Sequence, residues 1–135
     1  MEKGFIIDEA TRRIVTRVTE CVLTPGEINL GWKDISEVLL SDRTAVVTSG
    51  SGTGKDRAVK ACQDALSSYR IVARPAMRPA RVLFHLIGPK DLLLKDVNDA
   101  REVIERSLCP ASEVVFGVAL DDSLKDEVRI TIMAT

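Results

Sequence analysis

The chain changes from a helical pattern to an alternating one at Thr44-Ala-Val-Val-Thr-Ser-Gly-Ser-Gly-Thr-Gly-Lys-Asp56. The β-branched residues of Thr44–Thr48 predict a strand, and the glycines that follow predict a flexible turn between a strand and a helix. Asp56 can cap that helix, whose apolar positions are Ala58, Val59, Cys62, Ala65 and Leu66. A strand, a turn and a helix in this order favour an α/β domain.

The same alternation continues to the end of the chain. It predicts a connection at Tyr69–Ala80, a strand at Val82–Ile87, a helix at about Lys95–Ser107, and strands at Val114–Leu120 and Val128–Met133. The strand at Val82–Ile87 is apolar at nearly every position, so we expect it to be covered on both faces. Because the link Asp121–Glu127 is short, we predict that the last two strands form an antiparallel hairpin. The fold class is therefore α/β (α+β): a β-α-β-α-β-β module with a small four-stranded mixed sheet and helices packed on it.

A long amphipathic helix is predicted before this module. Its apolar stripe comprises Ile7, Ala10, Ile14, Val15, Val18, Cys21 and Val22. Thr24-Pro25-Gly26 ends the helix, and a shorter one is expected at Asp34–Leu40. We divide the chain into residues 1–40, with the helices and the loop between them, and residues 41–135, the α/β domain. An exposed apolar stripe on the first helix can drive a homodimer.

Composition excludes several classes of protein. Of the 135 residues, 45% are hydrophobic and 29% charged, which is typical of a globular domain. The net charge of −1 and the aromatic content of 4% indicate neither nucleic-acid binding nor attraction to an anionic membrane. The three cysteines form no CxxC pair, so Cys21 and Cys62 are predicted to be buried free thiols in a reducing compartment. Without a signal peptide or an apolar span in the sequence, we expect a cytoplasmic location.

The glycine-rich run is a poor match to a phosphate-binding loop. Ser49 stands where that motif needs glycine, and Asp56 stands where it needs Ser or Thr. His85 is the only histidine, so neither a metal site nor a catalytic triad is predicted, and a buried structural role is favoured. The acidic residues Asp121, Asp122, Asp126 and Glu127 do not have the spacing of a calcium loop and are explained by a turn.

Two polar residues in the loop between the predicted helices could carry chemistry. A carboxylate at Asp34 could orient or deprotonate a water molecule, and Asn29 could hold a phosphate oxygen. The alternative is structural, with Asp34 capping the second helix and Asn29 forming a turn. Spacing alone leaves both interpretations open.

A second candidate site is the basic cluster of Arg70, Arg74, Arg78 and Arg81, interleaved with prolines. The cluster is either a solvated loop or a binding site for an anionic ligand. The β-α-β-α-β-β order also resembles that of chorismate-mutase-like trimers. This resemblance gives the alternative function: a small oligomeric enzyme, or a binding module for an anionic ligand.

Several motifs in order resemble FtsZ, the bacterial tubulin-like division GTPase. They are Thr24-Pro25-Gly26-Glu27-Ile28-Asn29-Leu30 with Asp34-Ile35, Gly50-x-Gly52-Thr53-Gly54-Lys55-Asp56-Arg57-Ala58, Glu113-Val-Val-Phe-Gly117, and Asp121-Asp-Ser-Leu-Lys-Asp-Glu-Val-Arg129. The resemblance covers the end of the family's central helix and its C-terminal domain. It implies that GTP and Mg²⁺ are held by a partner subunit and that this chain alone binds neither and has no activity.

The resemblance also assigns roles to the loop. It implies head-to-tail assembly with FtsZ-like GTPase subunits, in which Asp34 polarises the attacking water and Asn29 positions the γ-phosphate. Subunit contacts would be made by Glu27, Leu30, Gly31 and Trp32. Two positions depart from the family, since Gly31 replaces a second acid and Lys55 replaces the usual Glu. Because the sequence stops at Thr135 without the family's terminal peptide, no direct contact with membrane tethers is expected.

Overall fold

A computed structural model of the chain describes residues 33, 35, 46–72, 81–108 and 113–135. The elements in these ranges are β1 (Val46–Thr53), α3 (Arg57–Val72), β2 (Arg81–Gly88), α4 (Leu94–Leu108), β3 (Glu113–Leu120) and β4 (Glu127–Ala134). Their order, β-α-β-α-β-β, confirms the predicted module. The predicted N-terminal helix and its homodimer contact lie outside the described residues.

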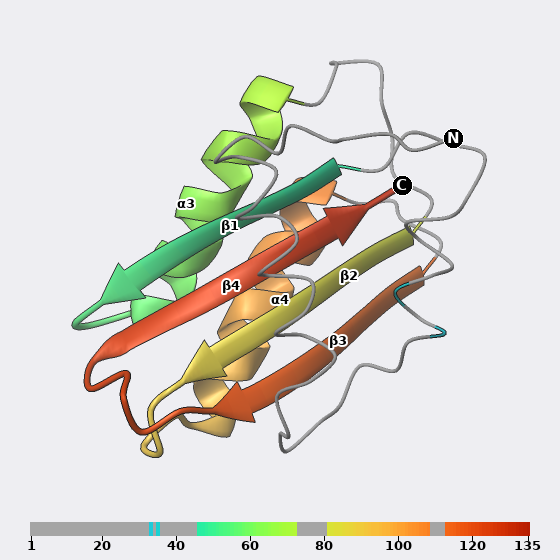
Figure 1. Cartoon of the computed structure of the whole chain (residues 1–135). Helices are drawn as coiled ribbons and strands as arrows, with labels where there is room; N and C mark the ends of the chain where they lie inside the picture. The colour runs from blue at the N-terminus through green and yellow to red at the C-terminus, as the bar shows by residue number, and fades with distance from the viewer. Residues whose placement is uncertain (1–32, 34, 36–45, 73–80, 109–112) are drawn as a thin grey trace, which may run out of the picture.

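The four strands form one mixed sheet in the order β1-β4-β2-β3. β4 is antiparallel to both of its neighbours, β1 and β2, whereas β2 and β3 are parallel. Figure 1 shows α3 and α4 side by side on one face of this sheet. The architecture is therefore the small mixed sheet with packed helices that the sequence predicts.

The predicted hairpin of the last two strands is wrong. β2 lies between β3 and β4, so the two strands that follow each other in sequence are not paired (Figure 1). Crossing one intervening strand requires roughly 10 Å. Six link residues, Asp121–Asp126, can span roughly 20 Å when extended. The short link therefore permits either arrangement, and burial favours the interior place for β4, which is buried at six of its eight positions.

The core between the sheet and the helices follows the predicted periodicity. On α3 the buried positions include Ala58, Cys62, Ala65 and Leu66, and on α4 they are Val97, Ala100, Ile104 and Leu108. Phe84 of β2 is fully buried and stacks on Phe116 of β3, with ring centroids 5.3 Å apart. β2 is buried at every position after Arg81, which confirms that it is covered on both faces.

Helix α3 is longer than predicted. Tyr69, expected to begin a connection, lies within the helix and is buried, and the helix continues to Val72. Asp56 precedes the helix with a left-handed φ of 57°, and its carbonyl accepts a hydrogen bond from Lys60 N. At the start of α4, the Asp96 carboxylate accepts a hydrogen bond from Leu93 N at 2.9 Å, half of a capping box.

The glycine-rich run is a strand rather than the predicted turn. Ser49–Thr53 continues β1 and pairs with β4, with Gly50 opposite Ile130 and Gly52 opposite Val128. A Cβ on Gly50 would lie 2.4 Å from Ala65 N, and one on Gly52 would lie 2.2 Å from Arg57 O. The two glycines therefore allow the backbone of α3 to approach β1 closely, and only Gly54 and the two residues after it make the turn.

Cys62 has the environment predicted for a structural thiol. It is fully buried in α3, and its Sγ–H donates to the carbonyl of Ala100 at 3.6 Å. Burial raises the pKa of this thiol to about 12, so it stays protonated and unreactive at neutral pH. Cys21 and Cys109 lie outside the described residues.

Candidate functional site

The loop predicted to carry chemistry is almost entirely outside the described residues. This applies to its two candidate catalytic residues, Asn29 and Asp34, and to its four predicted contact residues, Glu27, Leu30, Gly31 and Trp32. Lys33 and Ile35 are described, and both have helical backbone. Lys33 is exposed and Ile35 is fully buried, as expected for an apolar position of the predicted short helix.

The position of Gly50 and Gly52 bears on nucleotide binding by this chain. A phosphate-binding loop presents free backbone N–H groups at the start of a helix. Here the glycines lie within β1, one face of which is covered by α3. The run therefore does not form the open turn that would hold a phosphate. This agrees with the sequence, in which Ser49 and Asp56 do not match the phosphate-binding motif.

A cluster of charged residues joins three loops at the end of the sheet where β1, β2 and β3 finish. Arg57 donates to Asp91 at 2.8 Å and to Asp126 at 3.3 Å, and its side chain is only 11% exposed. Asp126 also accepts a hydrogen bond from Gly54 N at 2.8 Å. The hydrogen bond with Asp91 raises the pKa of Arg57 above its ordinary value. This Arg57 cluster fixes the β1–α3, β2–α4 and β3–β4 loops relative to one another.

Replacing Arg57 with alanine should lower the free energy of unfolding by about 1 to 2 kcal/mol, because two charge-assisted contacts to exposed carboxylates are lost together. Urea unfolding at low and high salt measures the effect, and the loss should shrink as salt screens the pairs. Lys95→Ala is the matched control, since it removes an exposed pair with Asp99 on α4 and should lower the free energy of unfolding much less. Equal losses in both variants would contradict the joining role of Arg57.

Contacts within the domain account for the acidic residues of the β3–β4 loop. Asp121 accepts from the backbone N and the hydroxyl of Ser123, at 2.9 and 2.8 Å, and these bonds lower the pKa of Asp121. Asp122 pairs with Lys90 at 3.1 Å. Within the described ranges no group of three or more His, Cys, Asp or Glu side chains is arranged to hold a metal ion. His85, the only histidine, is buried in β2 as predicted.

The predicted arginine cluster is represented by one described side chain. Arg81, at the start of β2, is 3.9 Å from Glu113 at the start of β3. Arg70, Arg74 and Arg78 have no described side chains. No described contact favours an anionic ligand at this cluster.

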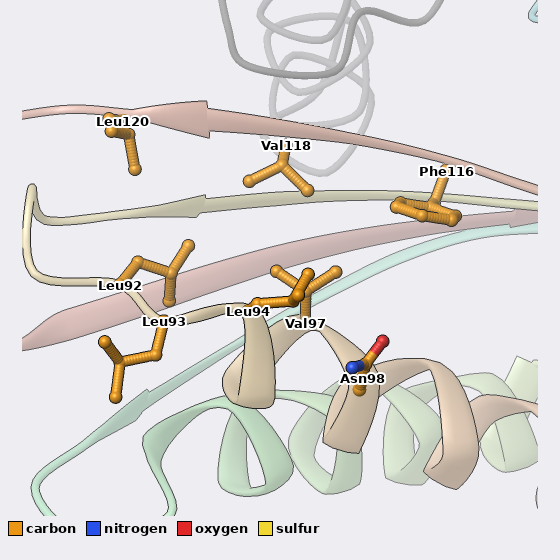
Figure 2. A pocket seen from close by; sticks show the side chains of 8 residues that line it. All are labelled: Leu92, Leu93, Leu94, Val97, Asn98, Phe116, Val118 and Leu120. Carbon is orange, nitrogen blue, oxygen red and sulfur yellow. The ribbon is translucent and has the colours of Figure 1, made fainter.

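An apolar groove lies between the start of α4 and strand β3. Figure 2 shows Phe116, Val118 and Leu120 pointing from β3 toward the leucines at the start of the helix. The groove has a volume of about 310 Å³, and its other lining residues are Leu92, Leu93, Leu94, Val97 and Asn98. Leu93 and Leu94 are 61% and 75% exposed. This groove was not predicted from the sequence. The three consecutive leucines at the start of the helix are nevertheless a signal, because a helix cannot bury all of them on one face.

Comparison with known proteins places this domain in a family. The description "FtsZ family, C-terminal domain" matches residues 43–135. The chain belongs to the FtsZ family. A curated relative, the cell division protein FtsZ of Caulobacter vibrioides, is 31% identical over 128 residues, which are 95% of this chain and 25% of that protein.

Solved structures of FtsZ-like proteins share the fold. An empty FtsZ dimer from M. jannaschii has a TM-score of 0.79 at 24% identity, over 94% of this chain and 37% of that one. A four-stranded filament of TubZ-Bt has a TM-score of 0.71 at 13% identity, over 93% and 33%. These similarities confirm the predicted FtsZ C-terminal fold.

The chain spans about a quarter of the length of the curated FtsZ relatives that it matches. The shared part is the C-terminal domain, together with the segment before it. No helix in the described part of the chain is both long and apolar enough to cross a membrane.

Proposed function

We propose that this chain is a polymerisation domain that contributes its Asn29–Asp34 loop to the GTP site of a neighbouring FtsZ subunit. The subunits would associate head to tail in the cytoplasm, and GTP and Mg²⁺ would be held by the neighbour. Asp34 would polarise the attacking water and Asn29 would position the γ-phosphate, while Glu27, Leu30, Gly31 and Trp32 would contact the neighbour's surface. GTP hydrolysis would then require assembly, because the site would be complete only between two associated subunits.

The observation that carries this proposal is the family match to residues 43–135, in a chain whose one phosphate-loop-like run is a strand covered by α3. Such a domain supports a contribution to another subunit's site better than a nucleotide site of its own. The Arg57 cluster and the buried core give the domain a fixed framework, which a loop needs if it is to complete a site across a subunit contact.

Prepared alone, the 135-residue chain should cap filaments, because it offers the loop without offering a nucleotide pocket to the next subunit. We expect filaments of full-length FtsZ from the same organism, assembled with GTP, to become shorter when the chain is added below equimolar amounts. Electron microscopy measures filament length, and phosphate release is followed in parallel.

The control is Trp32→Ala, which removes the apolar anchor of the predicted contact. Aromatic anchors of this kind commonly contribute about 2 kcal/mol or more to binding, so capping should need roughly 30-fold more of the variant. Unchanged filament lengths with an excess of the wild-type chain would contradict the proposal.

A further inference from the structure

The apolar groove between α4 and β3 is elongated. Phe116, Val118 and Leu120 are alternate residues of the strand, so the β3 wall of the groove is roughly 13 Å long (Figure 2). On the opposite wall, Leu94 and Asn98 are four residues apart and therefore lie on the same face of α4. The volume of about 310 Å³ is at the small end of the range for ligand pockets. The groove therefore suits a narrow, extended ligand.

The floor of the groove is buried, whereas part of its rim is exposed. Val97 and Val118 are both buried beneath it, and Leu93 and Leu94 lie at its mouth with most of their surface exposed. Large apolar side chains exposed together beside an apolar groove are typical of a binding surface. A ligand bound here would contact side chains only, so the site requires no free backbone edge of β3.

A cation lies at the Phe116 end of the groove. The Cζ atom of Arg101 is 6.0 Å from the centroid of the Phe116 ring. Arg101 follows Leu94 by seven residues, two turns along the same face of α4. Its Nε donates to Glu105 at 2.8 Å, and its two terminal nitrogens make no hydrogen bond to any described residue. These nitrogens can therefore bind an anionic group at this end.

The other end of the groove is lined by acidic residues. Asp121 and Asp122 follow the last residue of β3, and Asp91 precedes the three leucines. The nearby cations are already paired, Lys90 with Asp122 and Arg57 with Asp91. An anionic group is therefore disfavoured at this end, and the charges of the groove define one orientation for an anionic ligand.

We propose that the groove binds a free fatty acid of medium chain length, with its carboxylate at Arg101 and its alkyl chain along the β3 wall. An alkyl chain is narrow and carries no polar group that burial would separate from water, whereas a peptide segment would bury its backbone groups. The carboxylate would accept charge-assisted hydrogen bonds from the guanidinium, and Asn98 could donate another. This site is separate from the Asn29–Asp34 loop and goes beyond the proposed function.

Titration of the chain with decanoate, below the concentration at which decanoate forms micelles, tests this proposal. We expect saturable binding of one molecule per chain, with shifts in the NMR methyl signals of Leu94, Val118 and Leu120. Octanoate should bind roughly tenfold more weakly, because it lacks two methylene groups. Decyltrimethylammonium has the same chain length but the opposite charge, and should bind at least about tenfold more weakly than decanoate. No saturable binding, shifts confined to other residues, or equal binding of the two charges would overturn the proposal.

Two arginines of α4 provide a matched pair of variants. Arg101→Gln should weaken decanoate binding about tenfold, because the charge-assisted hydrogen bonds are lost. Arg106→Gln removes the same charge and a similar pair, with Glu102, but Arg106 does not line the groove, so this variant should bind decanoate as the wild type does. Equal weakening in the two variants, or none in either, would contradict the site. Thermal unfolding checks that both variants fold.

Flotation with vesicles of anionic phospholipid distinguishes a free fatty acid from a membrane surface as the ligand. We expect the chain to remain unbound by the vesicles, because the groove accepts a single alkyl chain. Binding to vesicles that is lost in Arg101→Gln, without binding of decanoate, would overturn the proposal in favour of a membrane contact.

Discussion

Replacing Gly52 with alanine should lower the free energy of unfolding of the domain by about 3 kcal/mol, at the upper end of the usual cost of overpacking. The added Cβ would lie 2.2 Å from Arg57 O and 2.7 Å from Ala61 N. Both are backbone atoms of α3, so the clash can be relieved only by moving the helix away from β1. That movement would also loosen the contacts of Ala61 and Ala65, which are fully buried between the helix and the strand.

Urea unfolding followed by circular dichroism measures this effect, and Gly54→Ala provides the contrast. Gly54 has a φ of 76°, and the nearest atom to an added Cβ is Lys60 Nζ at 3.9 Å. Its substitution should cost about 1 kcal/mol, through backbone strain alone. Ser49→Ala, in the same strand, adds no volume and should change little. If Gly52→Ala unfolded like Gly54→Ala, the close approach of α3 to β1 would be wrong.

The glycine-rich run shows why this part of the fold was not predicted from sequence. A run of glycines is the usual local signal of a turn, and nothing within Ser49–Gly54 distinguishes a turn from a strand beneath a helix. The determinant lies elsewhere in the chain. Ala58, Ala61 and Ala65 give α3 a face of small side chains, and glycines in the strand match that face. The glycines of β1 and the alanines of α3, considered together, indicate close packing of the helix on the strand.

The order of the strands in the sheet is the second feature that was not predicted from the sequence. Hydrophobic periodicity predicted α4 to within one residue at each end and predicted the buried faces of both helices, because periodicity reports burial directly. It does not report which strands are neighbours. The link between β3 and β4 is long enough to cross β2, so its length alone could not establish a hairpin. The Arg57 cluster was also beyond prediction, since its members are 34 and 69 residues apart.

The candidate loop was predicted by a different kind of evidence. Spacing left Asn29 and Asp34 open between a structural and a chemical role, and the family resemblance supplied the roles. The family match confirms the resemblance itself. The roles of the individual residues stay predictions, because these residues lie outside the described part of the chain. Chemistry at this loop therefore has to be tested by substitution.

Asp34→Ala should lower GTP hydrolysis in trans by about 100-fold while leaving docking largely intact, because a positioned acid or base typically contributes this much to a rate. The assay uses full-length FtsZ kept too dilute to assemble, with GTP bound and the chain in excess, so that the chain supplies the only loop. Single-turnover phosphate release measures hydrolysis. The fluorescence of Trp32, the chain's only tryptophan, reports docking separately.

Gly31 offers a second substitution for the same assay, one that should raise the hydrolysis rate rather than lower it. The FtsZ resemblance implies a second acid at this position, so the wild-type chain should stimulate hydrolysis less than an intact FtsZ subunit does. Gly31→Asp should raise the rate by about tenfold if the missing carboxylate is the cause. The double variant with Asp34→Ala should lose that gain, because a second carboxylate cannot replace one that orients the water. Equal rates from the wild-type and Asp34→Ala chains, with docking confirmed, would mean that the loop contributes contact but no chemistry. The chain would then act on filaments only by capping them.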